Sequence, residues 1–425
     1  MNNNIFEYVK VINQKSKTAF DNISRSSSKD RNLAILNTSL FVKQKKKEIL
    51  QANKIDIENA KQKNLTDAFV DRLFLNDKRI NDIINGLKKI AEMDDPIGIE
   101  LSRWKQPNGL DISRISVPLG IIGIIYESRP NVTIDAGSLC IKSGNTVILR
   151  GGSDSINSSK ILTSCLQEGL MSANLPADAV QMIDNTDREA VTAMLRSTGQ
   201  IDVIIPRGGK SLVNKVQQEA KVPVFAHLEG VCHLYIDKDA DVEKAIKIVI
   251  NSKMRRTGIC GALETLLIDE EISNKVVPIL VKKLMESGCH IKGDYETKAI
   301  ADEIELASEI DWETEYLEAI LSIKIVNGVS GAINHINNYS SNHTESIVTE
   351  NKITAESFLS SVDSAIVMHN ASTQFADGGE FGMGAEIGIS TGRIHARGPV
   401  GASQLTSFKY IVRGKDQIRD WKGKS

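Results

Sequence analysis

The sequence predicts an α/β protein built from two parallel α/β units with a small β structure beside them. Short runs of β-branched residues alternate with helical stretches between residues 120 and 239, and the same alternation returns between residues 242 and 369. This rhythm is typical of parallel sheets covered by helices. Helical patterns come before both units, and a β-like run at 406–412 follows them.

The first hundred residues predict a layer of amphipathic helices. Leu33, Leu36 and Leu40 recur at near-helical spacing among polar residues, and a second apolar set between Phe69 and Ile90 repeats that spacing. The pattern stops at Asp94-Asp95-Pro96.

A hairpin is expected next, because Asn108-Gly109 separates two segments of mixed polarity. An Asn-Gly pair favours a two-residue hairpin turn, since both positions tolerate positive φ. The run at 406–412 is expected to pair with this hairpin, either within one subunit or across a subunit boundary.

Each α/β unit has identifiable strands and helices. In the first, the expected strands are 120–126, 146–150, 180–183, 203–205, 224–226 and 233–236, and the expected helices are 136–140, 158–173, 189–195 and 211–220. In the second, the expected strands are 265–269, 320–326 and 365–369, and the expected helices are 242–252, 275–287 and 329–340.

Composition excludes several classes of protein. Among 425 residues, 52 Lys and Arg balance 54 Asp and Glu, so no global field attracts nucleic acid or anionic lipid. The longest apolar runs, 117–126 and 276–281, are shorter than the roughly 20 residues of a transmembrane helix. The N-terminus lacks the basic and apolar regions of a secretory signal. We therefore expect a cytoplasmic protein without a membrane or nucleic-acid partner.

Cys260 is the candidate nucleophile among five cysteines. No C-x-x-C pair and no zinc-binding spacing occurs, so we expect neither a disulfide framework nor a metal site. Cys260 follows Arg255 and Arg256 and has glycine close on both sides, at 258 and 261. The guanidinium groups would favour the thiolate, and small neighbours would admit a substrate carbonyl. A buried structural cysteine is the alternative.

Two glycine-rich turns are candidate phosphate sites. Gly151-Gly152 follows the strand 146–150, and Arg207-Gly208-Gly209 follows the strand 203–205. Such turns let backbone N–H groups approach a phosphate, although glycine is common in any α/β loop. Neither the P-loop nor the standard Rossmann fingerprint is present, since a P-loop would need glycine where Ile204 stands.

Two polar clusters are candidate substrate sites. Arg129 and Asn131 follow the apolar strand 120–126, at the sheet edge where ligands bind in open α/β sheets. Arg393 and Arg397 lie in a late loop whose composition suits an anionic substrate. An ordinary turn and a solvated loop are the respective alternatives.

Together these features resemble the aldehyde dehydrogenase superfamily. The resemblance lies in the order of Asn131 after a strand, a glycine-rich turn after the next strand, Cys260 beyond two α/β units, and a Gly/Arg-rich late loop. Within the superfamily it is strongest for the reductases of L-glutamyl 5-phosphate in proline biosynthesis. The matching segments are 117–120, 126–133, 205–209, 230–233, Cys260 with 264–267, 390–393 and 397–401.

The resemblance implies a fold, a division into domains and an oligomer. The fold would be aldehyde dehydrogenase-like, with two parallel α/β domains and a small β oligomerisation flap. Residues 1–102 and 119–238 would bind NADP, 239–393 would form the catalytic domain, and 103–118 with 394–425 would form the flap and C-terminal tail. A homo-oligomer is implied, with glutamate 5-kinase as an upstream partner.

The implied reaction is the NADPH-dependent reduction of L-glutamyl 5-phosphate to L-glutamate 5-semialdehyde and phosphate. Cys260 would form a thioester, and the Asn131 side chain with the Cys260 N–H would stabilise the oxyanions. The small-molecule substrate would meet Arg129, Arg393 and Arg397.

The implied cofactor is NADP(H), held by Arg150, Gly151, Gly152, Ser153, Arg207, Gly208, Gly209 and Glu315. NAD-preferring relatives carry an acid where this chain has Ser153, and an acid would repel the 2′-phosphate of NADP. Glu315 matches the residue that holds the nicotinamide ribose.

Two other functions stay open. The first is an aldehyde-oxidising NAD(P) dehydrogenase of the same superfamily, but hydrolytic members carry a Glu where this chain has His227. The second is a non-catalytic nucleotide-binding protein, which would not need a reactive Cys260.

Overall fold

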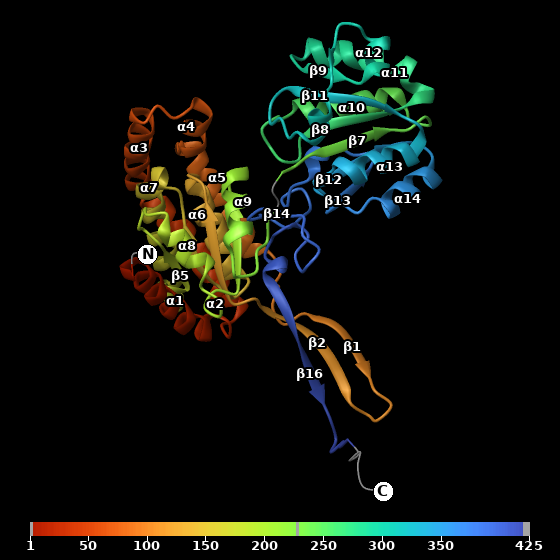
Figure 1. Ribbon diagram of the computed structural model, residues 1–425. Coiled ribbons are helices and arrows are strands. Elements are labelled where there is room, and N and C mark those ends of the chain that lie inside the picture. The colour runs from red at the N-terminus through yellow and green to blue at the C-terminus, as the bar shows by residue number, and fades with distance from the viewer. Residues whose placement is uncertain (1–2, 227–228, 420–425) are drawn as a thin grey trace. The chain divides into compact units, whose positions relative to one another are not determined.

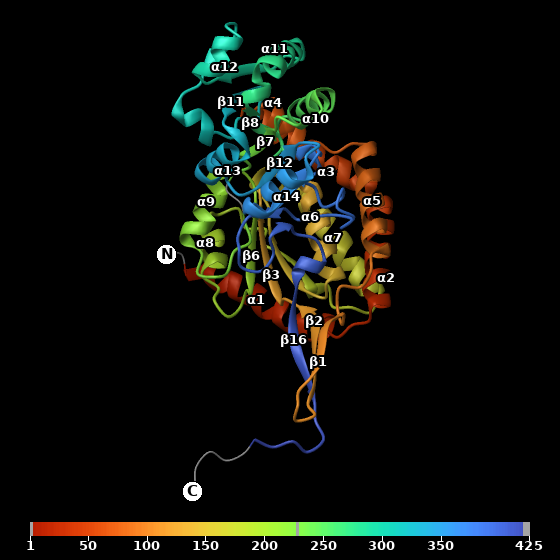
Figure 2. The ribbon, with the colours of Figure 1, turned by 90° about the vertical axis from the view of Figure 1, so that its right-hand side faces the viewer.

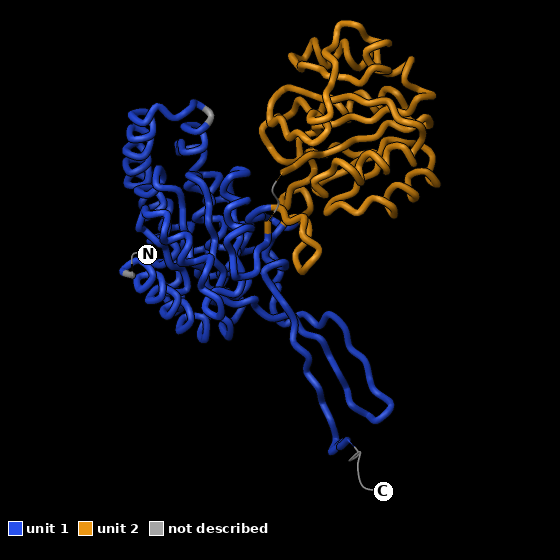
Figure 3. The backbone as a smooth tube through the Cα atoms, in the orientation of Figure 1, with its two compact units in different colours: residues 1–225, 383–388, 400–425 blue, residues 226–382, 389–399 orange. Residues whose placement is uncertain are grey.

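The structure of the chain is a computed structural model that describes residues 3–226 and 229–419. His227 and residues 420–425 of the predicted tail lie outside the described residues. The chain divides into two compact units (Figure 3). Unit 1 comprises residues 1–225, 383–388 and 400–425, and unit 2 comprises 226–382 and 389–399.

Unit 1 contains a parallel four-stranded sheet in the order β5-β4-β3-β6. Its strands are β3 (Ile121–Tyr126), β4 (Thr146–Arg150), β5 (Val180–Met182) and β6 (Val203–Arg207). Its helices are α6 (Pro130–Lys142), α7 (Ile156–Ser172), α8 (Glu189–Leu195) and α9 (Lys210–Glu219). All six residues of β3 are buried, because the central strand of a parallel sheet is covered on both faces.

The predicted helical layer forms the beginning of unit 1. Its members are α1 (Asn3–Ile23), α2 (Ser28–Gln44), α3 (Lys46–Gln62), α4 (Asp67–Leu73) and α5 (Asp77–Glu92). Side chains of Ser27, Thr66 and Asn76 cap three of these helices by accepting backbone N–H bonds. The apolar face of α5 is buried, as its periodicity predicts.

Lys142, at the end of α6, is buried with only 1% of its surface exposed. Its Nζ donates to Asn32 Oδ1 at 2.8 Å and to the carbonyls of Ala91 and Met93. This lysine therefore ties α6 to α2 and to the end of α5.

The predicted hairpin and late β-run form one antiparallel sheet in the order β1-β2-β16. Its strands are β1 (Glu100–Lys105), β2 (Asp111–Pro118) and β16 (Thr406–Arg413). The register pairs Thr406 with Pro118 and Arg413 with Asp111, so the pairing occurs within the subunit. Figures 1 and 2 show these strands extending together away from the rest of unit 1.

The hairpin turn is longer than the two residues that the sequence predicts. The N–H of Gln106 donates to the Leu110 carbonyl at 2.8 Å, and the N–H of Gly109 donates to the Gln106 carbonyl at 2.9 Å. Gly109 has φ of +89°, whereas Asn108 is not among the residues with positive φ. Asn108 instead accepts the N–H of Leu110 on its side chain, so only the glycine needs the left-handed conformation.

Unit 2 contains a seven-stranded parallel sheet in the order β10-β9-β11-β8-β7-β12-β13. The strands are β7 (Cys232–Ile236), β8 (Leu263–Asp269), β9 (His290–Gly293), β10 (Glu305–Leu306), β11 (Ile320–Val326), β12 (Thr344–Val348) and β13 (Ile366–His369). The helices are α10 (Val242–Met254), α11 (Glu270–Glu286), α12 (Tyr295–Ile300), α13 (Gly328–Tyr339) and α14 (Lys352–Ser361). One apolar core joins the sheet to α10 and α11, and another joins it to α13 and α14.

Several predicted boundaries differ from those of the structure. The segment 224–226 makes a single bridge, between Ile204 and Val224, and is not a strand. Strand β7 was expected in the first α/β unit, but it pairs with β8 and β12 in unit 2, so the first unit ends before residue 238. Residues 383–388 return to unit 1, while β14 (Ile389–Ser390) and β15 (Gly398–Pro399) pair in unit 2. The functions predicted for these domains stay predictions.

Candidate functional site

Cys260 lies in a turn between α10 and β8 and is partly exposed. The other four cysteines are buried, and burial raises the thiol pKa of each, to about 12 at Cys165 and about 11 at Cys289. A thiolate is the nucleophilic form of cysteine, and it also needs access to a substrate. Cys260 is therefore the cysteine best placed for nucleophilic attack.

Two glycines near Cys260 are in close contact with neighbouring backbone, and the predicted access of a substrate carbonyl at Gly258 and Gly261 stays a prediction. A Cβ on Gly230 would lie 2.1 Å from the Cys260 carbonyl oxygen, and a Cβ on Gly261 would lie 3.1 Å from the Thr373 carbonyl oxygen. These positions lack side chains because neighbouring backbone fills the space. Close protein packing, which adjacent residues in the sequence do not reveal, accounts for the small residues at these two positions.

The two arginines before Cys260 are exposed, and Arg255 Nη1 donates to Gln374 Oε1 at 3.4 Å. Gln374 is buried and donates to the carbonyls of Ser252 and Arg256. The segment around Gln374 thus holds the chain that leads into the Cys260 turn. An effect of the two guanidinium groups on the thiol stays a prediction.

Glu315 is linked to the same turn through Gly230. Its Oε1 accepts the N–H of Gly230 at 2.9 Å, and Gly230 packs against the Cys260 backbone. The predicted cofactor residue and the predicted nucleophile therefore belong to one neighbourhood of unit 2. Binding of the nicotinamide ribose by Glu315 stays a prediction.

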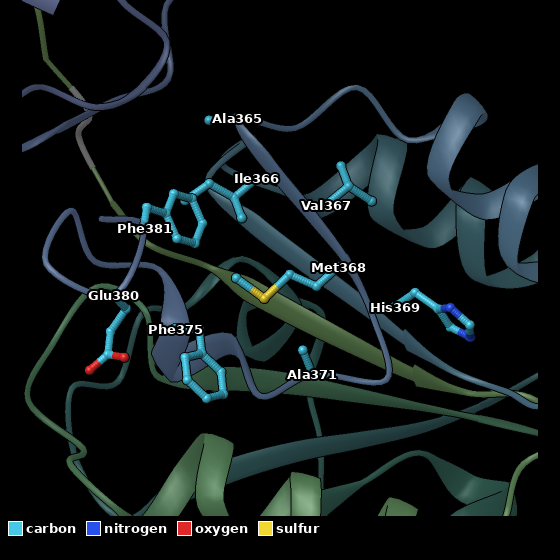
Figure 4. A pocket seen from close by; sticks show the side chains of 9 residues that line it. All are labelled: Ala365, Ile366, Val367, Met368, His369, Ala371, Phe375, Glu380 and Phe381. Atoms are coloured by element: carbon cyan, nitrogen blue, oxygen red, sulfur yellow. The ribbon is translucent and has the colours of Figure 1, made fainter. Parts of the chain in front are cut away.

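A pocket of about 520 Å³ lies along β13 and the loop after it (Figure 4). Figure 4 shows Ile366, Met368 and the rings of Phe375 and Phe381 around it, with Glu380 at one side. Ile366 and Met368 also belong to the apolar cluster on which Cys260 packs. The sequence analysis did not find this pocket, because its lining is brought together by a strand edge and a loop without a motif.

In unit 1 the predicted residues gather at the carboxyl ends of β3, β4 and β6. Pro130 is the first residue of α6, where its missing N–H costs nothing, and exposed Asn131 is the second. Asn131 Nδ2 donates to Asp135 Oδ2 at 3.0 Å, one helical turn later. Burial raises the pKa of Asp135 to about 6, although the Asn131 hydrogen bond and Arg207 oppose the shift. Arg129, just before the helix, has the extended backbone of an N-cap.

The turn after β4 is shaped by close contacts. Gly151 abuts the Tyr126 ring, and a Cβ on Gly152 would lie 2.2 Å from Ser128 Oγ. Arg150 is 9% exposed, and its guanidinium donates to the carbonyls of Gly151 at 2.7 Å and Thr186 at 3.0 Å. Arg150 therefore stabilises the turn, and its direct contact with a cofactor stays a prediction.

Exposed Ser153 begins the short 3₁₀ helix Ser153–Ser155 that follows this turn. Ser153 stands at the position where an acidic residue would repel a 2′-phosphate. It has a small hydroxyl side chain that solvent can reach.

The turn after β6 binds an anion of the protein itself. The N–H of Gly209, the N-cap of α9, donates to Glu127 Oε1 at 2.6 Å. A Cβ on Gly208 would lie 2.6 Å from Glu127 Cγ, so glycine is needed there for the carboxylate to approach. This contact shows that the backbone N–H of Gly209 can bind a negatively charged group. Arg207, beside it, is partly exposed.

Residues 6–308 match the family model described as "Aldehyde dehydrogenase family". The chain belongs to the aldehyde dehydrogenase family.

Close relatives of this chain within the family carry one name. A curated protein from Brucella suis biovar 1 (strain 1330), named "Gamma-glutamyl phosphate reductase", is 54% identical over 420 residues, which is 99% of this chain and 100% of that protein. The crystal structure of a gamma-glutamyl phosphate reductase from Thermotoga maritima is 44% identical, with a TM-score of 0.94 over 96% of this chain and 99% of that one. An acetylating aldehyde dehydrogenase from Geobacillus thermoglucosidasius, 18% identical with a TM-score of 0.69 over 98% of this chain and 99% of that one, shares the fold. The predicted aldehyde dehydrogenase-like fold is confirmed.

Aldehyde dehydrogenase family members use nicotinamide cofactors, and the turns of unit 1 suit one. Gly209 already binds a carboxylate through its backbone N–H, and the glycines after β4 let backbone come close. Cofactor phosphates bind to such amides at the carboxyl edge of a parallel sheet. Glu127 would have to leave Gly209 for a phosphate to take its place.

The two arginines of the late loop share one acidic partner. Arg397 Nη1 lies 2.5 Å from Asp363 Oδ1, and Arg393 pairs with the other oxygen of the same carboxylate. The hydrogen bond from Arg397 lowers the pKa of Asp363, so this acid stays ionised. The charge of the arginines is thus partly neutralised within the protein, and substrate binding by them stays a prediction.

Other residues of these neighbourhoods were missed in the sequence. Asp135 and Glu127 lie within or beside quoted motifs, but their contacts depend on the fold. Lys253 and Glu264 form a buried ion pair next to the Cys260 turn. Glu264 lies inside the apolar run of β8, and a charged residue at such a position indicates a buried partner of opposite charge.

The part of the chain described by the structure contains no group of three or more His, Cys, Asp or Glu side chains placed to hold a metal ion. In the same residues, no helix has both the length and the apolar content needed to cross a bilayer.

Proposed function

We propose that the chain catalyses the NADPH-dependent reduction of L-glutamyl 5-phosphate to L-glutamate 5-semialdehyde and phosphate, in proline biosynthesis. Relatives with this activity in their name are 54% identical over nearly the full length. The observation that carries the proposal is the position of Cys260, the one cysteine among five that is not buried.

Cys260 acts first in the proposed reaction. Its thiolate attacks the acyl carbon, the bond from that carbon to the bridging oxygen breaks, and phosphate leaves with the bonding electrons. The product of this step is a thioester on Cys260. The N–H of Cys260 and the side chain of Asn131 are the proposed donors to the oxyanion, and one N–H of Asn131 is already oriented by Asp135.

NADPH supplies the hydride that reduces the thioester carbonyl. Collapse of the resulting oxyanion expels the Cys260 thiolate and releases the aldehyde. Because no water attacks the acyl-enzyme, the reaction needs no general base to activate one, and this agrees with His227 at the position of the hydrolytic Glu.

We propose NADP(H) as the cofactor because exposed Ser153 stands where NAD-preferring relatives carry an acid. Arg150 would act indirectly, by holding the turn that leads to Ser153. The ratio of kcat/KM for NADPH and NADH tests this preference, and Ser153→Glu should shift the ratio toward NADH through repulsion of the 2′-phosphate. An unchanged ratio in that variant would contradict the proposal.

The proposal also covers the oligomeric state, the cellular location and the upstream partner of the enzyme. The β1-β2-β16 sheet exposes Trp104, Phe408 and Tyr410, which supports a homo-oligomer built through this flap. A cytoplasmic location agrees with five free cysteines. Glutamate 5-kinase is the proposed upstream partner because its product is the acyl phosphate.

The reverse reaction tests the activity. Enzyme with NADP⁺ and glutamate semialdehyde should form NADPH only when phosphate is present, since phosphate must release the acyl group from Cys260. Oxidation independent of phosphate would instead identify a hydrolytic aldehyde dehydrogenase.

The Cys260→Ala variant tests the thioester. It should abolish turnover while NADPH binding, followed by cofactor fluorescence, is retained. Unchanged turnover would overturn the thioester mechanism.

A further inference from the structure

Unit 2 contains an ion pair that is fully removed from solvent. Lys253 Nζ, in the last turn of α10, lies 2.5 Å from Glu264 Oε2 on β8, and both side chains have 0% exposure. Burial raises the pKa of Glu264, whereas Lys253 opposes that shift. Two well-packed apolar side chains would often stabilise the fold as well as a buried pair does, so burial of these two charges is weak evidence for a role in stability alone.

The pair contacts a loop that carries Glu315. The second oxygen of Glu264 accepts the N–H of Leu317 at 3.2 Å, and Lys253 Nζ lies 5.9 Å from the centroid of the Tyr316 ring. Leu317 has φ of +55°, a left-handed conformation that is unfavourable for leucine and persists only where contacts enforce it. The hydrogen bond to Glu264 is such a contact.

The same loop lies against the Cys260 turn at two points. Glu315 Oε1 accepts the N–H of Gly230, whose missing side chain would lie 2.1 Å from the Cys260 carbonyl oxygen. The Leu317 carbonyl oxygen lies 3.8 Å from the place of a Cβ on Gly258. Segment 315–317 is therefore the link between the buried charges and the turn that presents the thiol.

We propose that Lys253 and Glu264 are positioning residues that hold the Cys260 turn in place through segment 315–317. The pair acts through the left-handed backbone at Leu317 and through the bond from Glu315 to Gly230. This inference rests on the proposed function, because the geometry of Cys260 matters for attack on an acyl carbon.

Two double variants separate positioning from stability. Lys253→Met with Glu264→Gln removes both charges but keeps an oxygen that accepts the Leu317 N–H. Lys253→Met with Glu264→Leu also removes both charges, and it removes that acceptor. The two proteins differ chiefly in the hydrogen bond to Leu317, so a difference between them reports on the position of segment 315–317.

We expect the Met/Leu variant to lose about tenfold or more in kcat, because a displacement of about 1 Å costs on the order of a hundredfold. The Met/Gln variant should stay within about threefold of wild-type kcat, since the glutamine side-chain oxygen still accepts the Leu317 N–H. The rate at which iodoacetamide alkylates Cys260 should change at least threefold in Met/Leu and less in Met/Gln.

Alkylation needs no acyl phosphate, so it tests the positioning even if the proposed activity fails. Tyr235→Phe is the matched control, because Tyr235 and its partner Asp269 are also buried but lie at the other end of β7 and β8. It should leave kcat and the alkylation rate unchanged.

Leu317→Pro covers the case in which a double variant does not fold. Leu317 is 40% exposed, and proline has no N–H to donate to Glu264 and cannot adopt positive φ, so this variant releases the loop while it leaves both charges of the pair in place. It should show the same losses as Met/Leu. Wild-type kcat and alkylation in Leu317→Pro, or in a folded Met/Leu variant, would overturn the proposal, as would equal losses in both double variants.

Discussion

Gly230→Ala would place a methyl group inside the Cys260 turn. The new Cβ would lie 2.1 Å from the Cys260 carbonyl oxygen and 2.8 Å from its carbonyl carbon and Cα. Carbon and oxygen approach to only about 3.3 Å in close contacts, so the Cys260 backbone must move by roughly 1.2 Å. A displacement of that size costs on the order of a hundredfold in kcat, or about 2.7 kcal/mol in the barrier. Overpacking should also lower the free energy of unfolding by about 1–3 kcal/mol.

Steady-state kinetics in the phosphate-dependent reverse reaction measure this effect, and denaturant unfolding measures the change in stability. The matched control is Gly86→Ala in α5, where nothing lies within 4 Å of the new methyl group. That variant should keep full activity and gain up to about 1 kcal/mol, because alanine favours a helix interior. If Gly230→Ala folds and retains kcat within twofold of wild type, the turn tolerates displacement and the reasoning is refuted.

Three further predictions each concern one titratable residue. Glu127→Gln should tighten NADPH binding severalfold in a fluorescence titration, because the carboxylate at Gly209 competes with a phosphate; equal or weaker binding would contradict this. Burial lowers the pKa of His335 to about 3 from its ordinary 6.5. The contribution of neutral His335 to the free energy of unfolding is therefore fully present above pH 6.5 and is lost as the pH falls from 6.5 toward 3. About 1.4 kcal/mol is lost at pH 5.5, and His335→Phe should remove that loss in denaturant unfolding at pH 5.5 and 8. Burial raises the pKa of Asp135 to about 6 from 3.8, so its contribution to stability is present below pH 3.8 and is lost as the pH rises through 6. Asp135→Asn should flatten the pH dependence of the free energy of unfolding across that window; an unchanged pH profile would contradict the assignment.

The parts of the site that follow from local sequence were predictable. A cysteine among glycines, glycines after two predicted strands and an asparagine after a third identify candidates by residue type and spacing. The close packing at Gly230 and Gly261 could not be predicted, because their neighbours come from residues distant in the chain. Likewise, nothing near Arg150 or Lys142 in the sequence indicates that their charged ends bond to backbone carbonyls.

Long-range pairing explains the errors in the fold. Strand β12 was missed because Thr344–Val348 includes Glu345 and two hydroxyl residues. Glu345 is acceptable inside the sheet because His233 on β7, Ser340 and Ser364 all bond to its carboxylate. Strand β7 was assigned to the wrong unit because an apolar run does not specify its partners. Sheet register depends on which edges meet, and that choice is made between segments a hundred residues apart.

By itself the sequence determined the class of fold, the helical and strand periodicities, and the cysteine with the residue types around it. These properties are local, since they depend on the spacing of apolar residues and on backbone preferences within a few positions. Only the tertiary structure decided which charges are buried in pairs, which glycines admit neighbouring backbone, and that Glu264, Leu317, Glu315 and Gly230 form one path to Cys260. The physical reason is that burial and hydrogen bonding depend on which distant segments pack together, and no single segment contains that information.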